Sequence, residues 1–124
     1  MTRNDLEERL IDFAVLVTMI TRSFPSDREG NYYRDQLIRS CGAPGLNYGE
    51  AMGAESRKDF IHKIRIVLKE LRETFVALKI SKKLGLDQEN ETMPKALREN
   101  NELIAIFVKT LKTSNDNLNN KSKN

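Results

Sequence analysis

Apolar residues between Phe60 and Leu78 recur with the three- and four-residue spacing of an α-helix, and this pattern constrains the fold more than any other feature of the chain. The spacing places them on one stripe of a helix, which has to be buried against other elements. The stripe consists of Phe60, Ile61, Ile64, Val67, Leu68, Leu71, Phe75 and Leu78. We expect this helix to begin near Ser56 or Lys58 and to run to Leu84, with Gly85 in the left-handed position that closes helices.

The segment before this helix contains two more stretches with helical spacing. The first is expected to begin with Asp5 as a cap and to end near Pro25, with a buried stripe of Leu6, Leu10, Phe13, Val17, Ile20 and Phe24. After a turn from Pro25 to Gly30, a second helix carries Tyr33, Leu37, Ile38, Cys41, Tyr48 and Met52. Pro44 lies inside it and is expected to kink it, because proline removes an amide donor and clashes with the preceding turn. A split into two helices is the alternative.

The last part of the chain predicts a fourth helix and a tail. Residues 87–93 are polar and read as a loop, and Pro94 suits the first position of a helix. The stripe of this helix is Leu97, Ile104, Phe107, Val108 and Leu111. The sequence therefore predicts an all-α fold, an antiparallel up-and-down four-helix bundle over residues 1–113 with the second helix kinked near Pro44. Residues 114–124 are polar and are expected to form a disordered tail.

Composition agrees with a single helical domain. A chain of 124 residues is of ordinary single-domain size, and 39% of it is hydrophobic. No apolar run approaches the roughly 18 residues that a membrane span needs, so no membrane partner is expected. The N-terminal sequence MTRNDLEERL does not read as a secretory signal, and Cys41, the single cysteine, cannot form an internal disulfide. These features predict a cytoplasmic location.

Three glycines, Gly45, Gly49 and Gly53, follow one another at every fourth residue. On a helix they would lie on one face and allow another backbone to approach closely. We expect tight packing at this face and no phosphate site.

The stretch around these glycines resembles a known family. The resemblance rests on Asn47-Tyr48, Glu50-Ala51, Glu55-Ser56-Arg57, Asp59-Phe60-Ile61, Lys63, and Ile66-Val67-Leu68-Lys69-Glu70-Leu71 followed by Glu73; it extends more weakly over the first helix and from Leu103-Ile104 to Lys109. These motifs are similar to the small bacterial four-helix bundle proteins first found as open reading frames in intervening sequences of 23S ribosomal RNA genes. The chain departs from that family at Phe75-Val76, where a Tyr-Trp pair is usual, and at Pro44.

The resemblance implies an all-helical up-and-down bundle that often assembles into a five-membered ring. It also implies no established enzyme activity and a suspected role in binding nucleic acid. It extends to accessory bundle proteins of retroelements, which are thought to pair RNA with a reverse transcriptase.

Several apolar residues are predicted to lie opposite the buried stripes. They are Ile11, Val15, Ile66, Ile80 and Ile106. Scattered exposed apolar residues are normal, but β-branched residues on the outward faces of several helices favour a subunit interface. We therefore expect a homo-oligomer, and the family resemblance makes a ring, a homopentamer, the expected form.

Positive charge is concentrated in the third helix. Nine bases stand against three acids between Arg57 and Leu84. Five of the bases fall within a narrow arc: Arg65, Lys69, Arg72, Lys79 and Lys83. Such a band suits a phosphate backbone, so RNA is the expected partner. With few aromatic residues to stack bases, binding is expected to read backbone and shape. The alternative is a solvated face whose bases pair with acids one turn away, such as Lys69 with Glu73, on a structural or protein-binding scaffold.

Catalysis has little support in the sequence, and no enzyme activity, cofactor or metal is expected. Cys41 lies at an apolar helical position and is expected to be buried and inert. His62 follows Asp59 by three residues, with Glu55 one turn earlier. A carboxylate-x-x-His pair is half of a di-iron site, but the other half would have to come from a second copy. The favoured interpretation is a polar helix start with Asp59 near the helix dipole.

Overall fold

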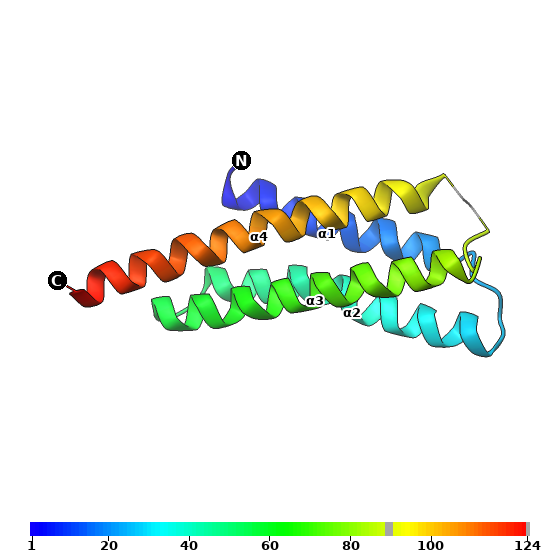
Figure 1. Cartoon of the computed structure of the whole chain (residues 1–124), viewed down its shortest axis with the longest axis horizontal. Helices are drawn as coiled ribbons and strands as arrows, with labels where there is room; N and C mark the ends of the chain where they lie inside the picture. The colour runs from blue at the N-terminus through cyan, green and yellow to red at the C-terminus, as the bar shows by residue number, and fades with distance from the viewer. Residues whose placement is uncertain (89–90, 124) are drawn as a thin grey trace.

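The computed structural model describes residues 1–88 and 91–123. These form four helices: α1 (Arg3–Thr21), α2 (Arg28–Met52), α3 (Arg57–Lys83) and α4 (Thr92–Lys123). Successive helices run in opposite directions along the long axis (Figure 1). The predicted all-α antiparallel up-and-down four-helix bundle is therefore confirmed. No helix in the described part of the chain has an apolar stretch long enough to cross a bilayer.

The first three helices begin at side chains that bond to the free amides of the first turn. The Oγ1 of Thr2 accepts a hydrogen bond from the amide of Asp5, and the carboxylate of Asp5 accepts one from the amide of Thr2. Asp27 and Ser56 cap α2 and α3 by accepting hydrogen bonds from the amides of Gly30 and Asp59. The prediction that Asp5 is the cap of α1 is wrong: Asp5 is the third residue of the helix and completes a capping box with Thr2.

The predicted end of α3 is confirmed. Gly85 has a φ of 69°, in the left-handed region that residues with a Cβ rarely adopt. The amide of Leu86 donates to the carbonyl of Ser81, and the amide of Gly85 donates to the carbonyl of Lys82. This pair of bonds is the Schellman arrangement, which satisfies two carbonyls at the end of the helix.

The α2 helix continues through Pro44, so the alternative in which it splits there is wrong. Pro44 is buried and cannot donate to the carbonyl four residues before it. Nearby, the side-chain amide of Asn47 donates to the carbonyl of Ala43 at 2.9 Å, which adds a bond beside the interruption. The kink at Pro44 stays a prediction.

The α4 helix differs from its prediction at both ends. It begins at Thr92, so Pro94 lies within the first turn and not at its first position. It continues to Lys123, whereas residues from 114 onward were expected to be disordered. Ser114 is buried and Leu118 is half-buried, so both continue the inward spacing of Leu111 despite the polar composition. Asn124 lies outside the described residues.

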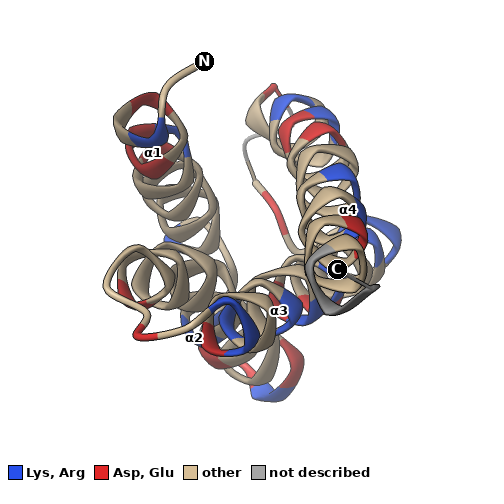
Figure 2. Ribbon diagram, turned by 90° about the vertical axis from the view of Figure 1, so that its left-hand side faces the viewer, with Lys and Arg blue, Asp and Glu red and all other residues tan. Residues whose placement is uncertain are grey.

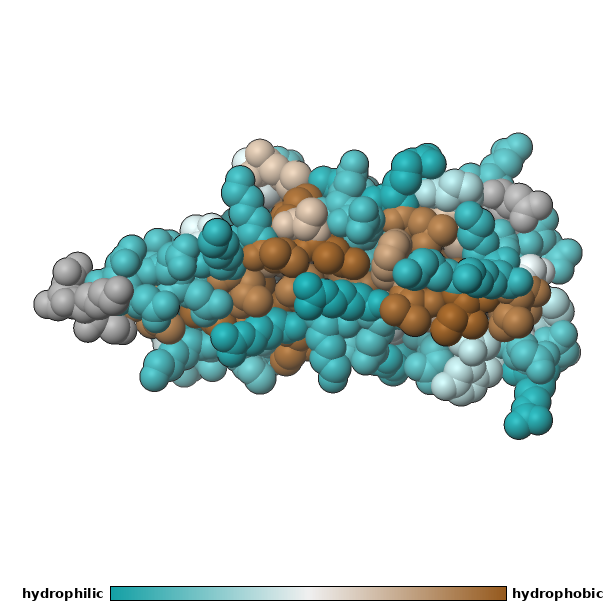
Figure 3. All heavy atoms as spheres, viewed as in Figure 1, coloured by the Kyte–Doolittle hydropathy of each residue, from teal (hydrophilic) through white to brown (hydrophobic). Residues whose placement is uncertain are grey.

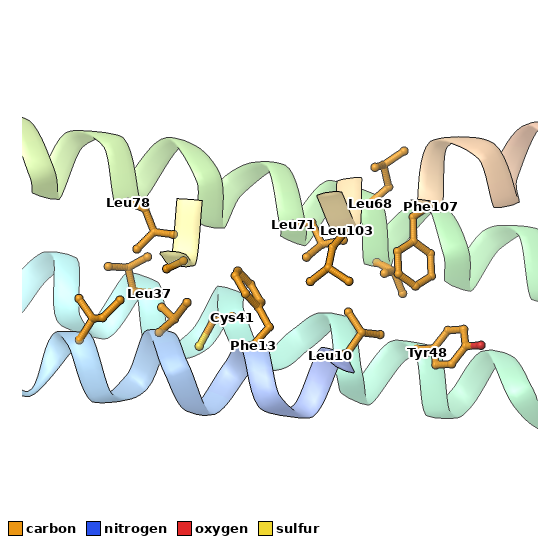
Figure 4. Packing of buried hydrophobic residues seen from close by; sticks show 14 of the residues in the cluster. Leu10, Phe13, Leu37, Cys41, Tyr48, Leu68, Leu71, Leu78, Leu103 and Phe107 are labelled. Atoms are coloured by element: carbon orange, nitrogen blue, oxygen red, sulfur yellow. The ribbon is translucent and has the colours of Figure 1, made fainter. Parts of the chain in front are cut away.

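The core is one cluster to which all four helices contribute (Figure 4). Phe13 and Phe107 are its largest fully buried side chains, and the ring of Tyr48 meets that of Phe107 edge-on at 5.6 Å between centroids. Ile38 and Val108, which the sequence pattern placed on inward stripes, are exposed instead. Both lie at the margin of their stripe, where helical spacing alone does not separate inside from outside.

Figure 2, which looks along the bundle, shows α2 and α3 side by side and α1 and α4 farther apart. The pair formed by α1 and α4 shares the smallest interface of the four neighbouring pairs. Arg9 bridges this seam: its Nη2 lies 2.7 Å from Oε1 of Glu99 and it also pairs with Glu102. The outer face of α3, between α2 and α4, is left uncovered.

Candidate functional site

The five bases singled out in the sequence lie on the exposed side of α3, and together we call them the basic band: Arg65, Lys69, Arg72, Lys79 and Lys83. All five are exposed. The ion pairs found among the described residues involve none of them. The band therefore presents its charge to solvent.

The acids of α3 that could have neutralised the band are paired elsewhere. Arg39 of α2 binds both, with its Nη1 3.0 Å from Oε2 of Glu70 and its Nη2 2.6 Å from Oε2 of Glu73. The hydrogen bond to Glu73, followed by the one to Glu70, raises the pKa of Arg39 above its ordinary value. The alternative in which Lys69 pairs with Glu73 is not what the structure shows. One guanidinium thus offsets part of the charge of the two carboxylates, and the basic band takes no part in these pairs.

A groove of about 860 Å³ runs over the outer face of α3 beside the basic band, and we call it the α3 groove. Arg65, Lys69 and Arg72 line it together. Its apolar lining includes Val76 and Ile80, both exposed. Figure 3 shows apolar side chains exposed over this side of the molecule, interrupted by polar ones. Three of the five predicted site residues thus meet at one hollow.

The other two bases continue the band beyond the groove. The Nζ of Lys79 lies 4.7 Å from the centroid of the Phe75 ring, within the range of a cation–π contact. Lys83 lies in the last turn of α3, where a positive charge complements the helix dipole. Both stay exposed.

An aromatic pair at the start of α2 belongs to the α3 groove and was missed in the sequence. Tyr32 is 57% exposed, and its ring meets that of Tyr33 edge-on, 5.0 Å between centroids. Both line the groove. The available signal was that the inward stripe of α2 included Tyr33 and left Tyr32, about 100° away around the helix, outside it. One exposed aromatic ring is thus present at this site, and the expectation that binding reads backbone and shape stays a prediction.

The five residues predicted to face outward fall into two groups. Ile11, Val15 and Ile80 are exposed, at 42%, 57% and 36%. Ile66 is half-buried, and Ile106 is half-buried and packs against the core, so its predicted outward position is wrong. A wider part of the surface of α4 contacts the core than the predicted narrow stripe. Their role in an interface stays a prediction.

Two further apolar residues are exposed on α2. They are Ile38, 44% exposed, and Leu46, 73% exposed. With Ile11 and Val15 they define what we call the α1–α2 face. The seam beneath it is close, because the Sγ of Cys41 donates to the carbonyl of Ala14 at 3.5 Å.

The predicted glycine ridge packs closely at only one position. A Cβ at Gly45 would lie 3.9 Å from the Cβ of Leu10, which is ordinary contact between α2 and α1. A Cβ at Gly49 would meet nothing within 4 Å, and one at Gly53 would meet only the carbonyl of Glu50. The prediction of tight packing along all three glycines is therefore wrong within one chain.

The residues considered for catalysis or metal binding do not come together. Cys41 is 1% exposed, and its burial raises the pKa of the thiol. Asp59 lies in the first turn of α3, and His62 and Glu55 are exposed. Across residues 1–88 and 91–123, no group of three or more potential metal ligands gathers.

Comparison with known proteins agrees with the fold. A family model described as "23S rRNA-intervening sequence protein" matches residues 3–109. A crystal structure of a protein of unknown function from the S23 ribosomal protein family of Bacteroides thetaiotaomicron superposes with a TM-score of 0.80. The two chains are 26% identical, and the match covers 90% of this chain and 99% of the other. No curated protein matches the sequence.

Proposed function

Because the chain belongs to the 23S rRNA-intervening sequence protein family, we propose that it is a non-enzymatic, self-associating helical bundle that binds RNA in the cytoplasm. The basic band of α3 binds the phosphate backbone. The observation that carries this proposal is the lack of any ion pair between the five bases and the acids beside them. A positive surface of this kind attracts polyanions and releases their counterions on binding.

Arg39 supports the proposal by holding the two nearest carboxylates. Repulsion between Glu73 and a bound phosphate is reduced, because that carboxylate already accepts a hydrogen bond from Arg39 at 2.6 Å. A merely solvated basic face does not need such compensation, since its own acids would be paired with its own bases one turn away.

Self-association is the second part of the proposal. The α1–α2 face exposes four large apolar side chains on neighbouring helices, whereas the basic band lies on α3. If that face is buried between subunits, the basic side chains of the band stay exposed. Each subunit of a ring then contributes one copy of the band. Repetition raises the overall affinity for a long polyanion by several orders of magnitude without any new contact.

The test is a charge reversal with a matched control. The variant Arg65→Glu, Lys69→Glu, Arg72→Glu should lose RNA binding in fluorescence anisotropy at low salt, with helicity and oligomeric mass unchanged. The control reverses three exposed bases on other helices, Arg28, Lys95 and Lys109, for the same change in net charge. If both triple variants lose binding equally, net charge and not the band governs it.

The alternative is a structural or protein-binding scaffold without a role in nucleic-acid binding. The exposed apolar side chains of the α1–α2 face and of the α3 groove favour it, because they also suit a protein partner. Absence of RNA binding by the unmodified protein at low salt would support this alternative.

A further inference from the structure

We propose that the α3 groove binds an unpaired stretch of RNA, with a base stacked on Tyr32 and the adjoining phosphates on Arg72, Lys69 and Arg65. This inference rests on the proposed function and specifies its ligand. A backbone-binding band alone would accept paired and unpaired RNA alike. The aromatic pair beside the band adds a preference for bases that are free to leave a stack.

The groove combines two chemically different parts. Toward the start of α3 its lining carries the three cations, and toward the end it carries Val76 and Ile80. From Arg65 to Ile80 the helix rises by about 22 Å. The volume of the groove, about 860 Å³, lies within the range of roughly 300–1,000 Å³ typical of pockets for small organic ligands. The groove is therefore long enough for a short run of backbone and wide enough for a base.

Tyr32 is placed to act as a stacking platform. Its ring is held edge-on by Tyr33, with an interplanar angle of 83° and 5.0 Å between centroids, and it is 57% exposed. An aromatic ring fixed in this way offers a free face with little further loss of conformational entropy. Proteins that bind single-stranded nucleic acid combine such aromatic faces with a positive groove that follows the backbone.

The position of Tyr32 relative to the cations follows from the antiparallel packing of α2 and α3. Lys63 pairs with Glu50, and Arg39 pairs with Glu73, so residues early in α2 lie beside residues late in α3. Tyr32 and Tyr33 accordingly line the groove with Val76, Ala77 and Ile80. A nucleobase against Tyr32 then rests on apolar side chains. The adjoining phosphates extend toward Arg72, Lys69 and Arg65, which lie nearer the start of α3.

An acidic amphipathic peptide also carries negative charge and apolar groups. The structure favours RNA over it, because the basic band continues past the groove to Lys79 and Lys83. A peptide confined to the groove would not contact these two charges, whereas a nucleic-acid strand that continues beyond the groove would. The experiment includes a peptide as a separate outcome.

The test compares a 12-nucleotide oligouridylate with a fully paired RNA hairpin, each labelled and titrated with the full chain in fluorescence anisotropy. Loss of one base–aromatic stack should weaken oligouridylate binding by Tyr32→Ala between about fivefold and about a hundredfold. Hairpin binding should change less than twofold, and Tyr32→Phe should retain the affinity of the unmodified protein. The control Leu46→Ala, on the α1–α2 face, should leave oligouridylate binding unchanged.

A second readout uses the absence of tryptophan from the sequence. In the variant Tyr32→Trp the single indole should be quenched when oligouridylate stacks on it, and the hairpin should not quench it. If both RNAs bind with equal affinity to Tyr32→Ala and to the unmodified protein, this inference is wrong and the proposed function stands. If neither RNA binds at low salt, the proposed function fails as well. Tyr32-dependent binding of a labelled acidic amphipathic helical peptide in place of RNA would overturn the choice of ligand.

Discussion

Arg39 is a single residue that affects the charge of the α3 surface. It reaches from α2 to two carboxylates of α3, one of which, Glu70, has a side chain only 10% exposed. A carboxylate that is nearly buried needs a partner, and the guanidinium supplies it together with a hydrogen bond. The same contacts offset part of the negative charge near Lys69 and Arg72. One residue therefore contributes to packing and to the electrostatic potential at the groove.

Cys41 provides a test at the same scale. Burial raises the pKa of its thiol above the ordinary value of 9.0, so at alkaline pH the unfolded chain loses this proton before the folded chain does. The stabilisation is complete below pH 9 and is lost as the pH rises through the higher pKa of the folded state. The free energy of unfolding from urea titration should therefore fall as the pH rises above about 9, with this thiol contributing at most about 1.4 kcal/mol per pH unit.

The control for Cys41 is Cys41→Ala, measured over the same pH range. Tyr48 also has a pKa raised by burial, and the variant keeps it, so only the part of the slope due to Cys41 should disappear. Equal slopes in both proteins would show that the thiol is as accessible to base in the folded state as in the unfolded state.

At the scale of helices, two glycines separate conformational from packing effects. Gly85 has a φ of 69° and open space around a Cβ, so Gly85→Ala should destabilise the bundle by about 1 kcal/mol through backbone strain alone. Gly49 lies within α2 and also has open space around a Cβ, so Gly49→Ala should stabilise by about 0.5–1 kcal/mol. Thermal and urea unfolding measure both. A stabilising Gly85→Ala would contradict the left-handed geometry at the end of α3.

The seam between α1 and α4 predicts the behaviour of the bundle in acid. The hydrogen bond from Arg9 lowers the pKa of Glu99 below its ordinary value of 4.5. Stability from this carboxylate is present above pH 4.5 and is lost as the pH falls through the lower pKa of the folded state. Glu99→Gln should therefore cost about 1 kcal/mol at pH 6 and progressively less as the pH falls below 4.5, measured by urea unfolding.

Glu102→Gln is the matched control for Glu99. It removes a second carboxylate bound to Arg9, but that side chain is 66% exposed, against 24% for Glu99. The expected cost at pH 6 is below about 0.5 kcal/mol. An equal loss from both variants would mean that burial of Glu99 does not strengthen its pair.

The helices were predictable from sequence wherever the local pattern decides them. The end of α3 at Gly85 followed from one residue, and its stripe followed from spacing. The start of α1 could not be predicted, because Thr2 and Asp5 are both possible caps. The length of α4 could not be predicted either, because Ser114 is a polar residue that is buried by its neighbours. The three cations of the groove were found from their arc, whereas Tyr32 and Arg39 belong to the site through the packing of α2 on α3.

The whole molecule exposes two surfaces that differ in chemistry. The α1–α2 face is apolar, and the basic band lies on α3. Gly42 adds open space on α2, since a Cβ there would meet nothing within a single chain. A second copy that docks there can approach the backbone of α2 closely.

The last prediction concerns this assembly. Val15→Glu places a charge on the α1–α2 face, where Val15 is 57% exposed, so it should leave the helicity of the chain unchanged. If that face joins subunits, the buried charge should dissociate the oligomer, and sedimentation equilibrium should change from a multiple of 14.3 kDa to that mass itself. Affinity for a long RNA should then fall by about a hundredfold or more, because the basic bands no longer act together, while affinity for the 12-nucleotide oligouridylate should change little. Val76→Glu, an equivalent change in the α3 groove, should do the reverse: it should keep the oligomer and weaken both RNAs. A monomer of unmodified protein at all concentrations would remove the subunit interface and leave the α3 groove to act alone.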